Sequence, residues 1–65
     1  MNVVDDKIFH IGETGVAHSK IAPLGTARFG DWMGEVRSFG EYVDAGEPIE
    51  IVKIEDAKIF IKSKT

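Results

Sequence analysis

The chain is a succession of short segments in which apolar and polar residues alternate, separated by turns that contain glycine or proline. Alternation with a period of two places successive side chains on opposite faces of an extended strand, so one face of each segment can be buried. We predict strands at residues 15–22, 26–29, 32–38, 49–54 and 58–62. In the fourth segment the apolar phase shifts between Ile51 and Val52, which indicates a bulge. Gly34, in the middle of the third segment, indicates a bend or a bulge there.

The apolar composition favours strands over helices. Eight Ile and six Val stand against a single Leu, and β-branched side chains pack well on a pleated surface but lose rotamer freedom on a helix. Seven glycines are spread along the chain and leave no space for a long helix. Five short strands are the minimum for a closed or nearly closed barrel. We therefore predict an all-β fold, a five-stranded OB-fold barrel of the oligonucleotide/oligosaccharide-binding type.

Length and charge restrict what such a barrel can do. Sixty-five residues without cysteine allow one small domain and exclude a disulfide scaffold or a Cys-ligated zinc site. We predict the domain at residues 12–63 and an N-terminal arm or extra element at residues 1–11. The net charge of −3 has the wrong sign for general phosphate binding. The chain has no signal-peptide pattern and no apolar run of the about 20 residues that a membrane span needs, so we expect it to be soluble as given.

No set of reactive side chains has the spacing that catalysis or metal binding requires. His10 and His18 are separated by a glycine-rich turn, and no further His or Cys completes a ligand set. Ser19 and Lys20 are neighbours on a predicted strand and point to opposite faces, so Lys20 cannot deprotonate Ser19. A second Ser-Lys pair, at residues 63–64, lies in the terminal tail, where preorganisation is poorest. We predict no catalytic residue, no cofactor and no bound metal ion.

Aromatic residues and arginines remain as candidates for a contact surface. Trp32 and Met33 put bulky side chains on both faces of a strand start, so part of this bulk is expected to be exposed. Arg28 and Arg37 lie on the second and third predicted strands, and Phe39 follows the third. We predict that Trp32, Met33, Arg28, Arg37 and Phe39 form the contact surface. Single-stranded nucleic acid is an alternative ligand, because many OB barrels stack bases on aromatic side chains, but eleven acidic residues argue against it.

Three blocks of sequence at fixed distances from one another carry a resemblance to a known family. They are Gly12-x-x-Gly15-x-Ala17-x-Ser19-x-Ile21-x-Pro23-x-Gly25 with Phe29-Gly30, then Val36-x-Ser38-x-Gly40-x-Tyr42-Val43, and then Ala45-Gly46-x-Pro48-Ile49-x-Ile51. The chain resembles the C-terminal soluble domain of the NfeD family from about residue 11 to residue 62. It departs from the family pattern at Ser19, where Thr is expected, and at residues 55–56, where a glycine-containing turn is frequent.

The resemblance implies a non-catalytic OB barrel that is normally the tail of a membrane-anchored protein. It implies a protein partner, a scaffold protein of the stomatin/prohibitin-like (SPFH) class, and membrane association only through segments absent from this chain. Longer family members also carry a ClpP-like serine protease domain, so an alternative role is that of an accessory domain of a membrane-bound protease. A further alternative is a biotinyl or lipoyl carrier domain, which residues 40–49 resemble. The candidate lysines, Lys53 and Lys58, lack the local pattern of a carrier.

Overall fold

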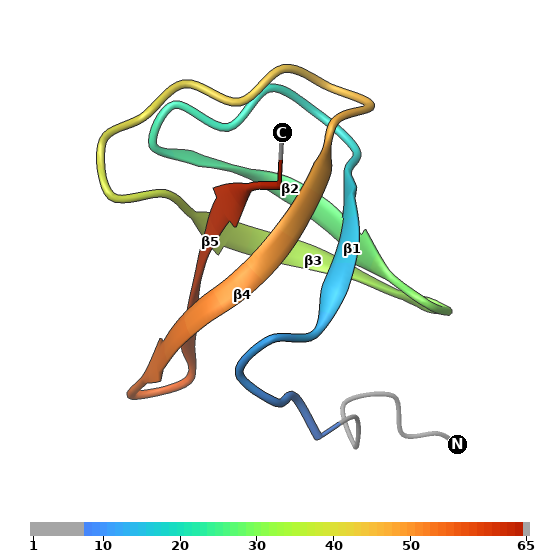
Figure 1. The fold of residues 1–65 in the computed structure, drawn as a ribbon, viewed down its shortest axis with the longest axis vertical. Helices are drawn as coiled ribbons and strands as arrows, with labels where there is room; N and C mark the ends of the chain where they lie inside the picture. The colour runs from blue at the N-terminus through green and yellow to red at the C-terminus, as the bar shows by residue number, and fades with distance from the viewer. Residues whose placement is uncertain (1–7, 65) are drawn as a thin grey trace.

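The computed structural model describes residues 8–64, which form five β-strands joined by loops, the longest of which, residues 38–47, connects the third strand to the fourth (Figure 1). The strands are β1 (Thr14–Ala17), β2 (Leu24–Phe29), β3 (Trp32–Arg37), β4 (Pro48–Glu55) and β5 (Lys58–Ser63). No helix occurs in this described part of the chain. The prediction of an all-β fold is confirmed, and each predicted strand is present with shifted ends.

The strands close into a barrel in the order β1-β2-β3-β5-β4. β1 pairs in antiparallel fashion with both β2 and β4, while β2–β3 and β4–β5 are antiparallel hairpins. The two hairpins meet where β3 runs parallel to β5, at the single pair of Arg37 with Phe60. The predicted five-stranded barrel of the OB type is therefore confirmed. Closure also covers strand edges that would otherwise pair with other chains.

The barrel interior is filled by apolar side chains that the alternation along the strands turns inward. Phe29 is the largest side chain with no exposed surface. Among the described residues the buried apolar set is Ala17, Ile21, Ala27, Phe29, Val36, Val43, Ile49, Ile51, Ile59 and Ile61. In β2 the expected phase holds, because Ala27 and Phe29 are buried and Arg28 between them is exposed. Seven of the twelve Ile and Val residues among residues 8–64 thus belong to the core, as a small domain requires.

The first strand is shorter than the predicted segment 15–22. The backbone N–H groups of His18 and Ser19 both donate to the carbonyl of Thr26, at 2.8 and 3.1 Å, and this shared acceptor bends the chain. Regular pairing with β2 stops there. Ile21 then pairs in isolation with the β3–β4 loop and is fully buried. The prediction of a continuous strand was wrong because alternation reports which side chains face inward and not whether the backbone ladder is unbroken.

Gly34 does not mark a bulge. The register between β2 and β3 runs without a shift from one end of the hairpin to the other. A Cβ atom at Gly34 would meet the indole ring of Trp32, which belongs to the same strand. The missing side chain therefore makes space for the Trp32 ring to lie along β3. The predicted bulge in β4, in contrast, is confirmed by a register shift between Ile51 and Lys53.

The β4–β5 hairpin turns through two residues with positive φ, Asp56 at 52° and Ala57 at 66°. A two-residue turn of this kind matches the twist of the flanking strands but favours Gly over Ala at such a position. We expect Ala57→Gly to raise the free energy of unfolding by about 0.5–1 kcal/mol, because it removes the left-handed strain of a Cβ atom. Urea denaturation checks this value.

A matched control for Ala57→Gly is Ala45→Gly, since Ala45 is also an exposed turn residue but its φ is not positive. There the glycine only increases the freedom of the unfolded chain, so the expected change is destabilising. Stabilisation by both substitutions, or by neither, would contradict the proposed strain at Ala57.

Candidate functional site

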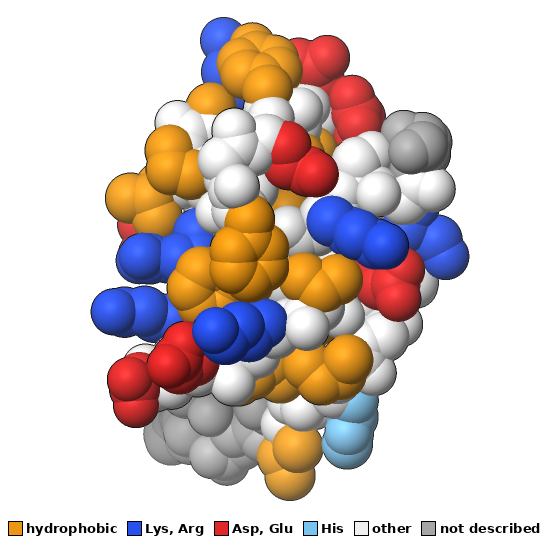
Figure 2. All heavy atoms as spheres, turned by 60° about the vertical axis from the view of Figure 1, so that its left-hand side comes forward, with side chains coloured by type: hydrophobic (Ala, Val, Ile, Leu, Met, Phe, Trp, Pro, Cys, Tyr) orange, Lys and Arg blue, Asp and Glu red, His pale blue; other side chains and the backbone are white. Residues whose placement is uncertain are grey.

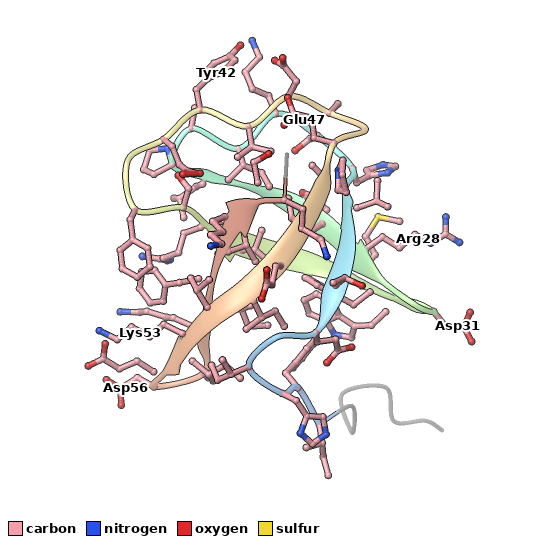
Figure 3. The ribbon with its side chains drawn as sticks, in the orientation of Figure 1. Arg28, Asp31, Tyr42, Glu47, Lys53 and Asp56 are labelled. Carbon is pink, nitrogen blue, oxygen red and sulfur yellow. The ribbon has the colours of Figure 1, made fainter. Side chains whose placement is uncertain are left out.

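The five predicted contact residues do not form one surface. Arg28 and Met33 face each other near the turn of the β2–β3 hairpin, whereas Arg37 lies at its opposite end and is paired with Leu24. These two pairs are four residues apart along each strand, which corresponds to about 13 Å at the rise of an extended chain. Figure 3 shows Arg28 and Lys53 of β4 on opposite sides of the barrel. The structure thus divides the predicted surface into two patches.

Trp32 belongs to the packing of the barrel rather than to either patch. Its ring lies 4.8 Å from that of Phe9 in an edge-to-face arrangement, and Phe9 contacts Phe29 in the same way at 5.9 Å. Both Phe9 and Trp32 pack against the buried core. Phe9 lies on the N-terminal side of the predicted domain boundary at residues 11–12, which stays a prediction. Residues 1–7 of the predicted arm lie outside the described residues.

The first patch consists of Val16, Arg28 and Met33, and we call it the Met33 patch. These residues pair in register across β1, β2 and β3. Val16 and Met33 are each 46% exposed. The Nε of Arg28 donates to the carbonyl of Gly30 at 3.3 Å, which directs the guanidinium back toward its own hairpin turn. This patch is small, and one cation adjoins its two apolar side chains.

The second patch, which we call the Phe60 patch, consists of Leu24, Arg37, Phe39, Lys53 and Phe60. Phe39 stacks on Phe60 with ring centroids 4.7 Å apart and an angle of 16° between the planes. The Arg37 guanidinium carbon and the Lys53 ammonium nitrogen lie 5.9 and 5.8 Å from the Phe60 centroid, within the range of cation–π attraction. Figure 2 shows hydrophobic side chains on one face of the molecule with Lys and Arg side chains around them.

Pairing between strands builds the Phe60 patch from distant segments. In register order the row runs from Leu24 of β2 to Arg37 of β3, then to Phe60 of β5 and Lys53 of β4. Phe60 and Lys53 were missed by the sequence reasoning. The signal for Phe60 is its place between the inward-facing residues Ile59 and Ile61, which obliges it to face outward. No comparable signal exists for Lys53, because the bulge in β4 changes which residues of that strand face outward.

The position of Phe39 is set by its neighbour Ser38, the one buried polar residue among those described. The Ser38 hydroxyl donates to the carbonyl of Glu41 at 2.6 Å, and its backbone N–H donates to the carbonyl of Pro23 at 2.8 Å. The first bond closes the start of the β3–β4 loop on itself, and the second holds it against the β1–β2 loop. Phe39 is consequently presented at the surface, 61% exposed, by an anchored backbone.

A separate cation–aromatic contact joins the same two loops at one end of the barrel. The ammonium nitrogen of Lys20 lies 5.5 Å from the centroid of Tyr42. A hydrogen bond with the Tyr42 side chain, the charge of that phenol when ionised and the nearby Asp44 raise the pKa of Lys20 above its ordinary value. A raised pKa in the folded state favours folding below the ordinary lysine pKa, and the contribution is lost as pH rises through the folded value. Near neutral pH the contribution of this contact therefore does not change with pH.

The two histidines considered as metal ligands are exposed, and the Ser19 hydroxyl considered for catalysis forms hydrogen bonds with the backbone. His10 and His18 are exposed, and no group of three or more His, Cys, Asp or Glu residues among residues 8–64 is placed to hold a metal ion. The Ser19 hydroxyl donates to the carbonyl of Lys20 at 3.2 Å and accepts the N–H of Thr26 at 3.0 Å. These hydroxyl bonds are structural. No helix among residues 8–64 is long and apolar enough to cross a membrane.

The closed five-stranded fold defines a class, that of small β-barrel domains. Residues 10–62 match the family of NfeD-like C-terminal, partner-binding domains, and the chain belongs to this family. The family resemblance predicted from the sequence is thereby confirmed.

The fold is also similar to a solved structure, the C-terminal domain of stomatin operon partner protein 1510-C from Pyrococcus horikoshii. The TM-score is 0.76 at 20% sequence identity, with 85% of this chain and 88% of that chain covered. At 20% sequence identity, this similarity shows that the two chains share a fold and nothing further. Comparison with curated proteins finds no significant match.

Proposed function

We propose that this chain is a non-catalytic protein-interaction domain, the tail of a membrane-anchored NfeD-like protein that acts with an SPFH scaffold protein. The observation that carries the proposal is the match of residues 10–62 to a partner-binding domain family. The similar structure from Pyrococcus horikoshii adds support, since its description names a partner protein of the stomatin operon. The division predicted from the sequence, with the domain at residues 12–63, belongs to the same proposal.

The distribution of apolar residues is in keeping with binding rather than chemistry. Seven Ile and Val side chains are enclosed in the barrel, whereas eight large hydrophobic residues among those described, Met33 and Phe39 included, are exposed on its outer surface. Exposed apolar groups rimmed by polar ones usually mark contact sites. We propose that the partner contacts one of the two patches on this outer surface, either the Met33 patch with Met33 and Arg28 or the Phe60 patch with Arg37 and Phe39.

The test is a titration of the ¹⁵N-labelled domain with a purified stomatin- or prohibitin-like protein encoded beside its gene. We expect backbone amide signals of one patch to shift or broaden, because a large partner slows tumbling and changes the local environment. Signals from Lys20 and Tyr42, at the loop end of the barrel, serve as an internal reference. Spectra that stay unchanged at high partner concentration would contradict the proposal.

Single-stranded nucleic acid is kept as the second candidate because of the stacked pair Phe39 and Phe60 with Arg37 beside it. Aromatic stacking with cation–π contacts is the chemistry of many single-strand binders. The net charge of −3 opposes it, since attraction to phosphates dominates such binding. An oligothymidylate titration at low ionic strength separates the two candidates.

A further inference from the structure

The Phe60 patch differs from the rest of the surface in its charge. Beyond Arg37 and Lys53, the exposed residues Lys58 and Lys62 flank Phe60 two positions away on either side along β5, so they share its outward face. Four of the eight Lys and Arg residues of the chain therefore surround one aromatic pair, although the net charge is −3. A cluster of cations on an otherwise acidic domain can attract and select a negatively charged partner through electrostatic complementarity.

The cations of the patch are only partly neutralised within the described residues. Lys53 forms an ion pair with Glu55 at 3.1 Å, with both side chains at least half exposed. In the register of β4 and β5, Glu55 also faces Lys58, and Glu50 faces Lys62. Arg37 has no carboxylate partner within the described part of the chain and contacts the Phe60 ring instead. Its guanidinium is therefore available to a carboxylate from another molecule, which it can bind in bidentate fashion.

The aromatic pair supplies an apolar anchor next to these charges. Phe39 is 61% exposed although it stacks on Phe60, and Leu24 beside Arg37 is 47% exposed. Phe39 is held in place from behind by the bonds of Ser38, so binding would order little additional backbone. Rigid aromatic side chains beside arginine are the usual composition of interface hot spots.

We propose that the Phe60 patch binds an extended acidic segment of a protein partner in which an aromatic or aliphatic side chain lies between carboxylates. The apolar side chain covers Phe39, and the carboxylates meet Arg37 and the lysines of β4 and β5. This inference rests on the proposed function and names the chemistry of the partner. Glu50 and Glu55 lie within the row of lysines and repel any anion placed beside them. A protein segment fits better than nucleic acid because its carboxylates can be spaced to avoid these two residues, whereas the phosphates of a nucleic acid form a continuous line.

The test titrates the ¹⁵N-labelled domain with a short acetylated peptide in which glutamate and phenylalanine alternate at every second position. The residues between the glutamates and phenylalanines of this peptide are serines, so that in an extended chain both kinds of side chain lie on one face. We expect saturable amide shifts confined to the surroundings of Arg37, Phe39 and Phe60, weakened by added salt because the charges are exposed. The same peptide with glutamine in place of glutamate should bind roughly tenfold more weakly, the loss typical of a charged interface contact. Equal binding of the two peptides would overturn the proposal.

Variants of the two patches provide a matched comparison. Phe39→Ser and Arg37→Gln should each weaken binding of the acidic peptide by roughly tenfold. Met33→Ser and Arg28→Gln remove an exposed apolar side chain and a guanidinium from the Met33 patch and should leave the affinity for the acidic peptide unchanged. All four residues lie on the outer surface, so the folded state is expected to persist, and circular dichroism verifies it. An equal loss in both sets of variants, or tighter binding of oligothymidylate than of the peptide at the same ionic strength, would refute the assignment.

The SPFH titration distinguishes this inference from the proposed function. If the SPFH protein binds the unaltered domain and both Phe60 patch variants equally well, the Phe60 patch is not the contact site and only the further inference fails. If the SPFH protein does not bind at all, the proposed function fails, and the peptide titrations still decide the chemistry of the patch. Self-association through the patch would instead give concentration-dependent shifts of the same amides without any peptide, which would also overturn the inference.

Discussion

Phe29→Ala is expected to lower the free energy of unfolding by about 3–5 kcal/mol, the usual cost of deleting a buried phenylalanine side chain. Phe29 is the largest fully buried side chain, and its ring contacts Phe9 and lies 6.3 Å from that of Trp32. A domain of this size is typically stable by about 3–10 kcal/mol, so the substitution removes much or all of that margin. Most of the chain is then expected to be unfolded at moderate temperature.

Urea denaturation followed by far-ultraviolet circular dichroism measures the effect of Phe29→Ala. Met33→Ala is the control, because Met33 is 46% exposed on the neighbouring strand and should change stability by about 0.5 kcal/mol or less. A loss below about 1 kcal/mol for Phe29→Ala would contradict the central place assigned to this ring.

Gly15→Ala is expected to lower the free energy of unfolding by about 2–3 kcal/mol, although it adds a single methyl group. A Cβ atom at Gly15 would meet the backbone carbonyl oxygen of Arg28 and the ring of Phe29. This carbonyl belongs to β2, the strand with which β1 is paired. It therefore cannot move aside without opening the barrel. The expected loss of stability comes from this steric clash and not from backbone strain, because φ of Gly15 is not positive.

The control for Gly15→Ala is Thr14→Ala, at the exposed preceding position of β1. There a β-branched side chain is shortened without a clash, and a loss of no more than about 1 kcal/mol is expected. Thermal denaturation of the two variants side by side gives the comparison. Equal midpoints would show that β1 and β2 do not approach each other as closely as described.

Both substitutions also bear on the candidate site, because the patches exist only on the closed barrel. The Phe60 patch spans four strands, and its centre is the pair of Arg37 and Phe60 that joins the two hairpins. Loss of closure would separate these two residues even if each hairpin survived. We therefore expect partner binding to be lost together with folding in these variants, which is why the binding tests use surface substitutions instead.

The local pattern of the sequence was sufficient for the number, order and buried faces of the strands, although not for the length of β1. Alternation places Ala27 and Phe29 inward and Arg28 outward, because successive side chains on a strand point to opposite faces. The phase shift after Ile51 predicted the bulge for the same reason. The family resemblance likewise depended on glycines, prolines and hydroxyl residues at fixed spacing, which turns and close approaches require.

The sequence by itself thus determined that this protein is a five-stranded barrel of the NfeD-like family with a core of β-branched residues. Only the tertiary structure decided which outward residues meet. Arg37 and Phe39 join Phe60 and Lys53, while Trp32 turns toward Phe9 and the core. The physical reason is that the direction of a side chain follows from its own strand, whereas its neighbours depend on pairing between β3 and β5, which are distant in sequence.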